Sequence, residues 1–467
     1  MNFKNISVLM SVTLAFSVFT STANAQVSGT SRHVSRTGVD AGTCAVEAPC
    51  KTFAYAMKQS APGDTIHAEP GNYPVEKLAR VGGSEGAPIT LDGNGAVSAG
   101  FILDRVNWIV IENFNFDGND VIDITAQSHF ITVRENTVKF GHAGLYVRGF
   151  SSHILVENNE FYQTCAKGLT WTQVKGSDCE GGAFYGSSYG GGSYYIHDNY
   201  VHDVFNAFLF TDDADEEDDE YAQDDSSGSG EWMNSNVFIY GNRISTVMDD
   251  VFEPEGDSFN IHFYNNIVTE AHRMASLTTA ATGPVFIYGN YQRTFSNPTH
   301  EDTRENSMLK LDFSEGSYDN GVWVFNNTVF SLMSEIFYPL DMLSDEVSNL
   351  YMMNNIFNTT NPVVNSEPIF SVNTLFDFNI TRSGFGYPEK NGLQTYPFVK
   401  FNGTLMSISP AVKRSTEIDI PGYFLLSPVV PSGTDAGAFS TYSAPVWVMP
   451  PGGYPTLIPA NIESWQG

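Results

Sequence analysis

Residues 249–255 (Asp-Asp-Val-Phe-Glu-Pro-Glu) contain several carboxylates that one short strand can present together. Side chains alternate between the two faces of a strand, so Asp249, Glu253 and Glu255 are expected on one face and Phe252 on the other. Carboxylates this close repel one another, and a purely structural strand gains little from them. Such a cluster can bind a cation through its oxygens, or provide the acid and base of a hydrolysis.

The neighbours of these carboxylates depend on the fold, which a repeat along the chain predicts. The repeated unit is an apolar stretch that ends in asparagine. Its asparagines are Asn113, Asn136, Asn159, Asn199, Asn242, Asn266, Asn290, Asn327, Asn355 and Asn379. Steps of 23 or 24 residues recur, with longer steps where loops are inserted, which is typical of a solenoid. Because such a step suits three short strands and three turns, we predict an all-β solenoid whose asparagines point inward and form a hydrogen-bonded ladder.

Motifs before and after the repeat resemble a known superfamily. The N-terminal ones are Lys51-Thr-Phe, Pro62-Gly-Asp-Thr-Ile, Pro70-Gly-Asn-Tyr and Pro88-Ile-Thr-Leu, and the C-terminal one is Gly433-Thr-Asp-Ala-Gly-Ala-Phe439. Over about residues 33–440 the chain resembles the pectate-lyase-like right-handed parallel β-helix superfamily. The resemblance implies a single-stranded right-handed parallel β-helix. Because that superfamily includes lyases, glycoside hydrolases, epimerases and non-enzymes, and its catalytic motifs do not match here, it implies no reaction.

Charge and leader indicate an exported protein. The 467 residues contain 23 Lys and Arg against 53 Asp and Glu, a formal net charge of −30, which argues against a nucleic-acid partner. The apolar run 6–19 followed by Ala23-Asn24-Ala25 is typical of a signal peptide, so a secreted or periplasmic protein is expected, with no membrane span. We expect a monomer with a signal peptide at 1–25, a catalytic β-helix at 26–440 and a Pro- and Gly-rich tail at 441–467.

The four cysteines form two closely spaced pairs, Cys44 with Cys50 and Cys165 with Cys179. In an exported chain two local disulfides are the expected arrangement, although four cysteines allow three pairings. The second pair lies in the insertion between Asn159 and Asn199. The next insertion carries an acidic run over 212–225, which is typical of a solvated loop.

Stacking the coils predicts which residues surround the carboxylates. Equivalent positions of neighbouring coils stack about 4.8 Å apart, so the asparagines serve as register marks. Asp249, Arg273 and Lys310 each lie 17 residues before a repeat asparagine, which predicts one outward column. The surface patch expected from this register consists of Asp249, Glu253, Glu255, Arg273, Lys310 and Asp312.

This patch suits β-elimination on a uronate, the reaction of a polysaccharide lyase. Lys310 would remove the proton α to the carboxylate, while Arg273 would stabilise the negative charge that develops. Calcium held by Asp249, Glu253 and Glu255 would neutralise the substrate carboxylate. We therefore expect a calcium-assisted lyase that acts on an acidic polysaccharide.

Two other functions remain open. An inverting glycoside hydrolase needs two carboxyls about 6.5–9.5 Å apart, which Glu253 with Asp249 or with Glu255 can provide. A non-catalytic β-helix that binds glycans would use the patch as a salt-bridge ladder. Further substrate-binding residues are expected at Arg148, His272, Asp312 and Tyr288.

Overall fold

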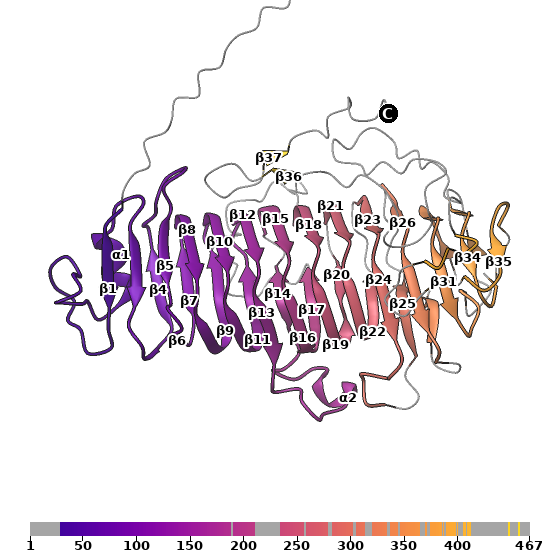
Figure 1. Ribbon diagram of the computed structural model, residues 1–467, viewed down its shortest axis with the longest axis horizontal. Helices are drawn as coiled ribbons and strands as arrows, with labels where there is room; N and C mark the ends of the chain where they lie inside the picture. The colour runs from indigo at the N-terminus through magenta and orange to yellow at the C-terminus, as the bar shows by residue number, and fades with distance from the viewer. Residues whose placement is uncertain are drawn as a thin grey trace, which may run out of the picture.

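The repeated apolar stretches form parallel strands that stack coil upon coil, as the computed structural model shows (Figure 1). The structure describes residues 29–411, 447–448 and 456–457. Within 29–411 it leaves out 188–189, 211–233, 256–257, 279–282, 302–304, 313–319, 334–336, 344–345, 365–368, 371–373, 385, 387–388, 398, 400–404 and 408. The predicted signal peptide, the acidic run, the 433–439 motif and most of the tail lie outside the described residues. Within the described part, no helix is long and apolar enough to cross a membrane.

The first face of the solenoid is a 13-stranded parallel sheet. Its strands, in spatial order, are β1 (Ser31–Val34), β2 (Thr65–Ala68), β5 (Ile89–Asp92), β8 (Asn107–Glu112), β10 (His129–Arg134), β12 (Ser152–Glu157), β15 (Gly192–His197), β18 (Ser235–Tyr240), β21 (Phe259–Tyr264), β23 (Val285–Tyr288), β26 (Val322–Phe325), β30 (Leu350–Met353) and β33 (Leu375–Asp377). Spatial order follows chain order throughout, as expected for a solenoid with one strand of each coil in this sheet.

Two further parallel faces complete each coil. The second consists of β3 (Asn72–Tyr73), β6 (Val97–Ser98), β9 (Asn115–Thr125), β11 (Thr137–Val147), β13 (Glu160–Gln163), β16 (Tyr200–Val204), β19 (Arg243–Asp250), β22 (Ile267–Leu277), β24 (Tyr291–Thr294), β27 (Thr328–Ser331), β31 (Ile356–Thr359), β34 (Ile380–Thr381) and β35 (Leu393–Gln394). The third consists of β4 (Glu76–Ala79), β7 (Phe101–Asp104), β14 (Gly182–Gly186), β17 (Asn206–Phe210), β20 (Phe252–Pro254), β25 (Asn306–Leu311) and β28 (Phe337–Met342). The long strands β9, β11, β19 and β22 bend from the second face into the third. The predicted right-handed parallel β-helix is confirmed.

Two small pairs of strands lie outside these faces. Strand β29 (Glu346–Val347) pairs in parallel with β32 (Ile369–Phe370). Strand β36 (Trp447–Val448) pairs with β37 (Thr456–Leu457) in antiparallel orientation.

The asparagine ladder is confirmed from Asn136 to Asn379. Each side-chain amide donates to the side-chain oxygen of the next ladder asparagine at 3.0–3.2 Å. Asn113 is an exception, because it donates to Asp92 Oδ1 instead. Glu112 pairs with Arg134, so Phe114 occupies the ladder position of that coil, and its backbone N–H donates to Asn136 Oδ1 at 2.9 Å.

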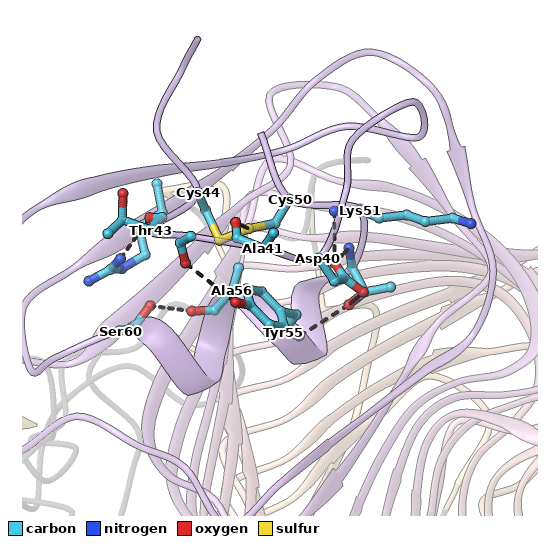
Figure 2. Close-up of a disulfide and its surroundings, with 12 residues drawn as sticks. Asp40, Ala41, Thr43, Cys44, Cys50, Lys51, Tyr55, Ala56 and Ser60 are labelled. Carbon is cyan, nitrogen blue, oxygen red and sulfur yellow. Dashed lines mark hydrogen bonds between the residues drawn. A yellow bond between two sulfur atoms is a disulfide. The ribbon is translucent and has the colours of Figure 1, made fainter. Parts of the chain in front are cut away.

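In the sequence, the apolar residues Phe53, Ala54 and Met57 lie at helical spacing and predict a short helix. Helix α1 (Phe53–Gln59) forms there and closes the N-terminal end of the solenoid. Thr52 caps this helix by accepting a hydrogen bond from the Tyr55 N–H. The predicted Cys44–Cys50 disulfide lies just before it, beside the loop in which Asp40 accepts bonds from residues 51 and 52 (Figure 2). Phe53 covers the end of the core and packs edge-on against Phe101.

A second buried apolar cluster lies on the outward side of the first sheet. Strand alternation places Ile239, Phe263 and Ile287 in the main core, and their neighbours in sequence point away from it. These outward side chains include Phe238, His262, Phe286, Tyr288 and Phe325, all fully buried. The ring of His262 stacks between Phe238 and Phe286, with centroids 4.8 and 4.5 Å away, and its burial lowers the pKa of His262 to about 3.

This buried histidine predicts acid sensitivity. Unfolded His262 takes up a proton near its ordinary pKa of about 6.5, whereas the folded state does so only near pH 3, so stability present above pH 6.5 is lost as pH falls. Through this residue the native protein should lose about 3 kcal/mol of unfolding free energy between pH 7.5 and pH 4, and His262→Phe should not show this part of the loss. Chemical denaturation at both pH values measures this, with the exposed His300→Gln as control. Equal pH dependence in His262→Phe and the native protein would contradict the expectation.

Candidate functional site

The carboxylates of residues 249–255 lie where the chain bends from the second face into the third. In the pairing of β19 with β22, Val247 is opposite Ala271 and Asp250 is opposite Arg273, so β19 carries one extra residue. This β-bulge interrupts the simple alternation that the sequence predicted. The two residues that follow the bulge, Val251 and Phe252, both enter the core.

Beyond the bulge the alternation holds, and the two glutamates behave as predicted. Glu253 and Glu255 line the same pocket, while Phe252 stacks in the core on Phe263. Glu255 accepts a hydrogen bond from the Thr278 hydroxyl on the next coil. The predicted shared face therefore exists for the glutamates.

The predicted column is wrong in its register. Arg273 stands opposite Asp250 rather than Asp249, and it is followed by Ser307 rather than Lys310. Lys310 stands opposite Ser276 on one side and Asp341 on the other. The reason is turn length.

Counting back from the ladder asparagines assumes equal turns between the third face and the next coil. The step from Leu277 to Val285 spans eight positions, whereas the equivalent step from Leu311 to Val322 spans eleven. The three extra residues shift Lys310 by three positions relative to Arg273. The ladder asparagines lie outside this turn, so counting back from them does not reveal a change in its length.

The side chains nevertheless form one charged cluster, in which Arg273 is the buried cation. Its Nη1 lies 3.7 Å from Asp249 Oδ1, and its Nη2 lies 3.3 Å from Asp341 Oδ2. Arg273, Asp249 and Asp341 are 8%, 4% and 6% exposed. Sequence reasoning found the first pair but missed Asp341, which the register with Lys310 would have revealed.

Burial and repulsion from neighbouring carboxylates make Asp249 and Asp250 weak acids. Burial, and then the charge of Asp250, raise the pKa of Asp249 to about 7, while Trp171, Arg273 and Lys175 act in the opposite direction. Burial also raises the pKa of Asp250. One side-chain oxygen of each aspartate, Oδ1 in both cases, is buried without a hydrogen-bond partner among the described residues.

Glu253 is also a weak acid. Burial, and then the charges of Asp250, Glu255 and Asp249, raise its pKa well above the usual range. Lys310 opposes this shift but does not cancel it. The Glu253 carboxyl lines a pocket, and a carboxyl with a raised pKa is suited to act as a general acid there.

A loop from the Asn159–Asn199 insertion brings a further cation that sequence reasoning missed. Residues 164–180, here called the arm, contain helix α2 (Trp171–Val174) and are closed by the predicted Cys165–Cys179 disulfide. In Figure 1, α2 projects below the strands of the solenoid. Lys175 follows this helix and forms an ion pair with Glu180.

The other predicted substrate-binding residues are not all near the cluster. His272 is fully buried, with Nδ1 3.3 Å from Asn306 Oδ1, and Tyr288 is buried in the stack on the first sheet, so neither is accessible to substrate. Arg148 binds both oxygens of Asp123, at 3.1 and 3.0 Å, three coils before Glu255. Asp312 lies in the same column as Glu255, two coils further on, with Thr278 on the coil between them.

Calcium has suitable donor atoms here, but no preformed cage. Carboxylate oxygens are the ligands that calcium prefers, and among the described residues one buried oxygen of Asp249 and one of Asp250 have no hydrogen-bond partner. Within the described ranges, however, no three His, Cys, Asp or Glu side chains are grouped so as to hold a metal ion. The chemistry of the donors fits the ion better than their present arrangement does.

Comparison with known proteins gives similarities of fold. No family model matches the chain. The chain is 30% identical over 157 residues to the uncharacterized protein YwoF of Bacillus subtilis (strain 168), which is 32% of the chain, and it spans about a third (33%) of that relative. The solved pectate lyase Pel9A matches with 13% identity and a TM-score of 0.36, covering 88% of this chain and 96% of that one. The PL6 family alginate lyase AlyGC matches with 13% identity and a TM-score of 0.42, covering 76% and 54%.

The fold and the cluster together define a right-handed parallel β-helix protein with a buried, mixed-charge site on its third face. Likeness at these identities concerns the fold alone. What the site does must therefore be argued from its own residues.

Removing the buried cation should destabilise the protein strongly. Arg273→Ala leaves Asp249 and Asp341 without their counter-ion, so we expect the free energy of unfolding to fall by about 3–5 kcal/mol at pH 8. Arg243, which is exposed on β19 of the preceding coil, is the control, and Arg243→Ala should cost less than about 1 kcal/mol. Denaturation midpoints measure both. Equally small losses for the two variants would show that Arg273 is not the counter-ion of the cluster.

Proposed function

We propose that the chain is an exported enzyme that degrades an acidic polysaccharide by β-elimination at the Asp249–Asp341 cluster. The observation that carries the proposal is the position of Lys310. It is partly exposed and stands in register with Asp341, the carboxylate that binds the buried guanidinium of Arg273. A mobile amine next to a fixed cation is the arrangement that removal of a proton α to a carboxylate requires.

In this mechanism the unprotonated amine of Lys310 accepts the proton from the carbon α to the uronate carboxylate. The electron pair of the broken C–H bond forms a carbon–carbon double bond, and the β C–O bond to the leaving sugar breaks. Arg273 stabilises the negative charge that develops on the carboxylate. The departing oxygen takes up a proton from solvent.

Calcium is part of the proposal. Asp249, Glu253 and Glu255 would hold it, together with Asp250, whose buried Oδ1 has no hydrogen-bond partner within the described part of the chain. When bound, calcium would supply positive charge that neutralises the substrate carboxylate. The excess of buried carboxylates over cations, which raises the pKa of Asp249, Asp250 and Glu253, supports binding of a cation here.

A second candidate is an inverting glycoside hydrolase, which the raised pKa of Glu253 favours. Glu253 would act as general acid, and Glu255 or Asp249 as the base that activates water. Glu253 and Glu255 occupy strand positions i and i+2, which lie about 7 Å apart, within the range that inversion needs. Export is proposed from the two disulfides, which persist in oxidising compartments.

A substrate panel separates the candidates. The full chain is incubated with uronate-containing and neutral polysaccharides, with and without calcium, while ultraviolet absorbance of unsaturated uronates and reducing ends are followed. We expect both signals to rise on an acidic polymer, and more strongly with calcium. Reducing ends without the absorbance would indicate the hydrolase, and neither signal on any polymer would favour a non-catalytic glycan-binding β-helix.

The base is tested by Lys310→Ala. Loss of a general base lowers the rate about 10²–10⁴-fold, and we expect a loss in this range with unchanged thermal stability. Lys390→Ala, at an exposed lysine remote from the cluster in sequence, is the matched control and should retain the native rate. Full activity in Lys310→Ala would eliminate Lys310 as the base.

A further inference from the structure

We propose that the arm, residues 164–180, walls a separate binding subsite for one sugar unit next to the cleavage position, and that Lys175 recognises an anionic group on that unit. The substrate class rests on the proposed function. The subsite itself rests on a pocket and on the way in which the arm is held over it.

A pocket of ≈ 310 Å³ lies between the arm and the third face. Lys175 and Glu180 line it from the arm, Tyr185 and Leu209 from strands β14 and β17, and Glu253 from β20. The volume is within the range of small-ligand sites. Because Glu253 belongs to the charged cluster, the pocket opens directly onto the proposed reaction site.

Glu253 and Glu255 form the end of the pocket at the cleavage position, and the register places the Tyr185 end beside that position. Tyr185 pairs with Leu209, and Leu209 pairs with Glu253, so Tyr185 lies two coils from Glu253. Two coils correspond to about 10 Å, which leaves room for a neighbouring sugar unit. The ring of Tyr185 is partly exposed and lies 4.8 Å from the Tyr146 ring and 5.7 Å from His142, which fixes an aromatic surface for a sugar ring.

Lys175 is the cation of this pocket. Its side chain is 47% exposed and is paired with Glu180. Partial burial opposes its charge, but Glu180, Asp249 and Glu253 hold the pKa of Lys175 above its usual value, so it stays charged. A lysine ammonium on a flexible stem can exchange one carboxylate partner for another, and a substrate carboxylate or sulfate can take the place of Glu180.

The arm is held in place before any ligand binds. The Cys165–Cys179 disulfide closes it, and Ala166 and Val174 pack with Met248 in a small apolar cluster. A second loop supports the far side of the arm. The backbone N–H of Trp171 donates to the Thr299 carbonyl at 3.0 Å, and the backbone N–H of Thr172 donates to Glu301 Oε1 at 2.8 Å. A wall ordered in advance reduces the entropy that binding must overcome.

The test is a microarray of acidic and neutral oligosaccharides probed with the full chain, followed by calorimetric titration of the best acidic binder and its neutral counterpart. Native protein should bind acidic members. Lys175→Met should lose about tenfold or more in affinity for them, because a charge-assisted hydrogen bond is lost, while neutral binding is unchanged. Lys167→Met, an exposed lysine on the same arm, is the control, and Lys175→Arg should retain acidic binding.

The possible outcomes separate this inference from the proposed function. Acidic binding that Lys175→Met abolishes, without cleavage of any polymer, supports the subsite and removes the proposed reaction. Cleavage of an acidic polymer with equal binding by Lys175→Met and native protein overturns the subsite alone. Native protein that binds no acidic oligosaccharide also overturns the subsite.

Discussion

The amide ladder from Asn136 to Asn379 is the constraint on which the rest of the structure depends. After the first, each ladder asparagine accepts two hydrogen bonds on its side-chain oxygen, one from the side-chain amide and one from the backbone N–H of the preceding asparagine. Asn266 Oδ1, for example, accepts both bonds from Asn242, at 3.0 Å each. Buried amides that lack a partner are costly, so a coil that slipped by one residue would lose these bonds and expose its core side chains. The ladder thereby fixes which residues of neighbouring coils stand side by side.

The charged cluster is a consequence of that stacking. Asp249, Arg273 and Asp341 come from separate coils, yet the register brings them within ion-pair distance in a setting almost without water. Arg273 cannot neutralise all the carboxylates around it, so burial and repulsion keep Asp249 and Glu253 poorly acidic. Groups with such shifted pKa values are costly for folding and are concentrated at functional sites.

Much of the fold was predictable because it repeats. The asparagine period indicated the solenoid, the stripe at 53–57 indicated α1, and the spacing of the cysteines indicated both disulfides. Asn113 was misassigned because an Asn one residue before the ladder position looks the same in sequence.

The site was only partly predictable, because it depends on departures from the repeat. The bulge before Asp250 and the longer turn after Leu311 shift side chains by one and three positions, and no local signal marks either. Lys175 reaches the cluster from an insertion, whose path the repeat does not determine.

The central claim is that this cluster cleaves an acidic polysaccharide by elimination, and the mass of the products tests it most directly. A defined acidic oligosaccharide is digested to completion and the two fragments are weighed by mass spectrometry. Elimination adds nothing to the chain, so the fragment masses should add up to that of the substrate, with the double bond on the fragment from the reducing side. Fragment masses that exceed the substrate by one water molecule would show hydrolysis and contradict the account.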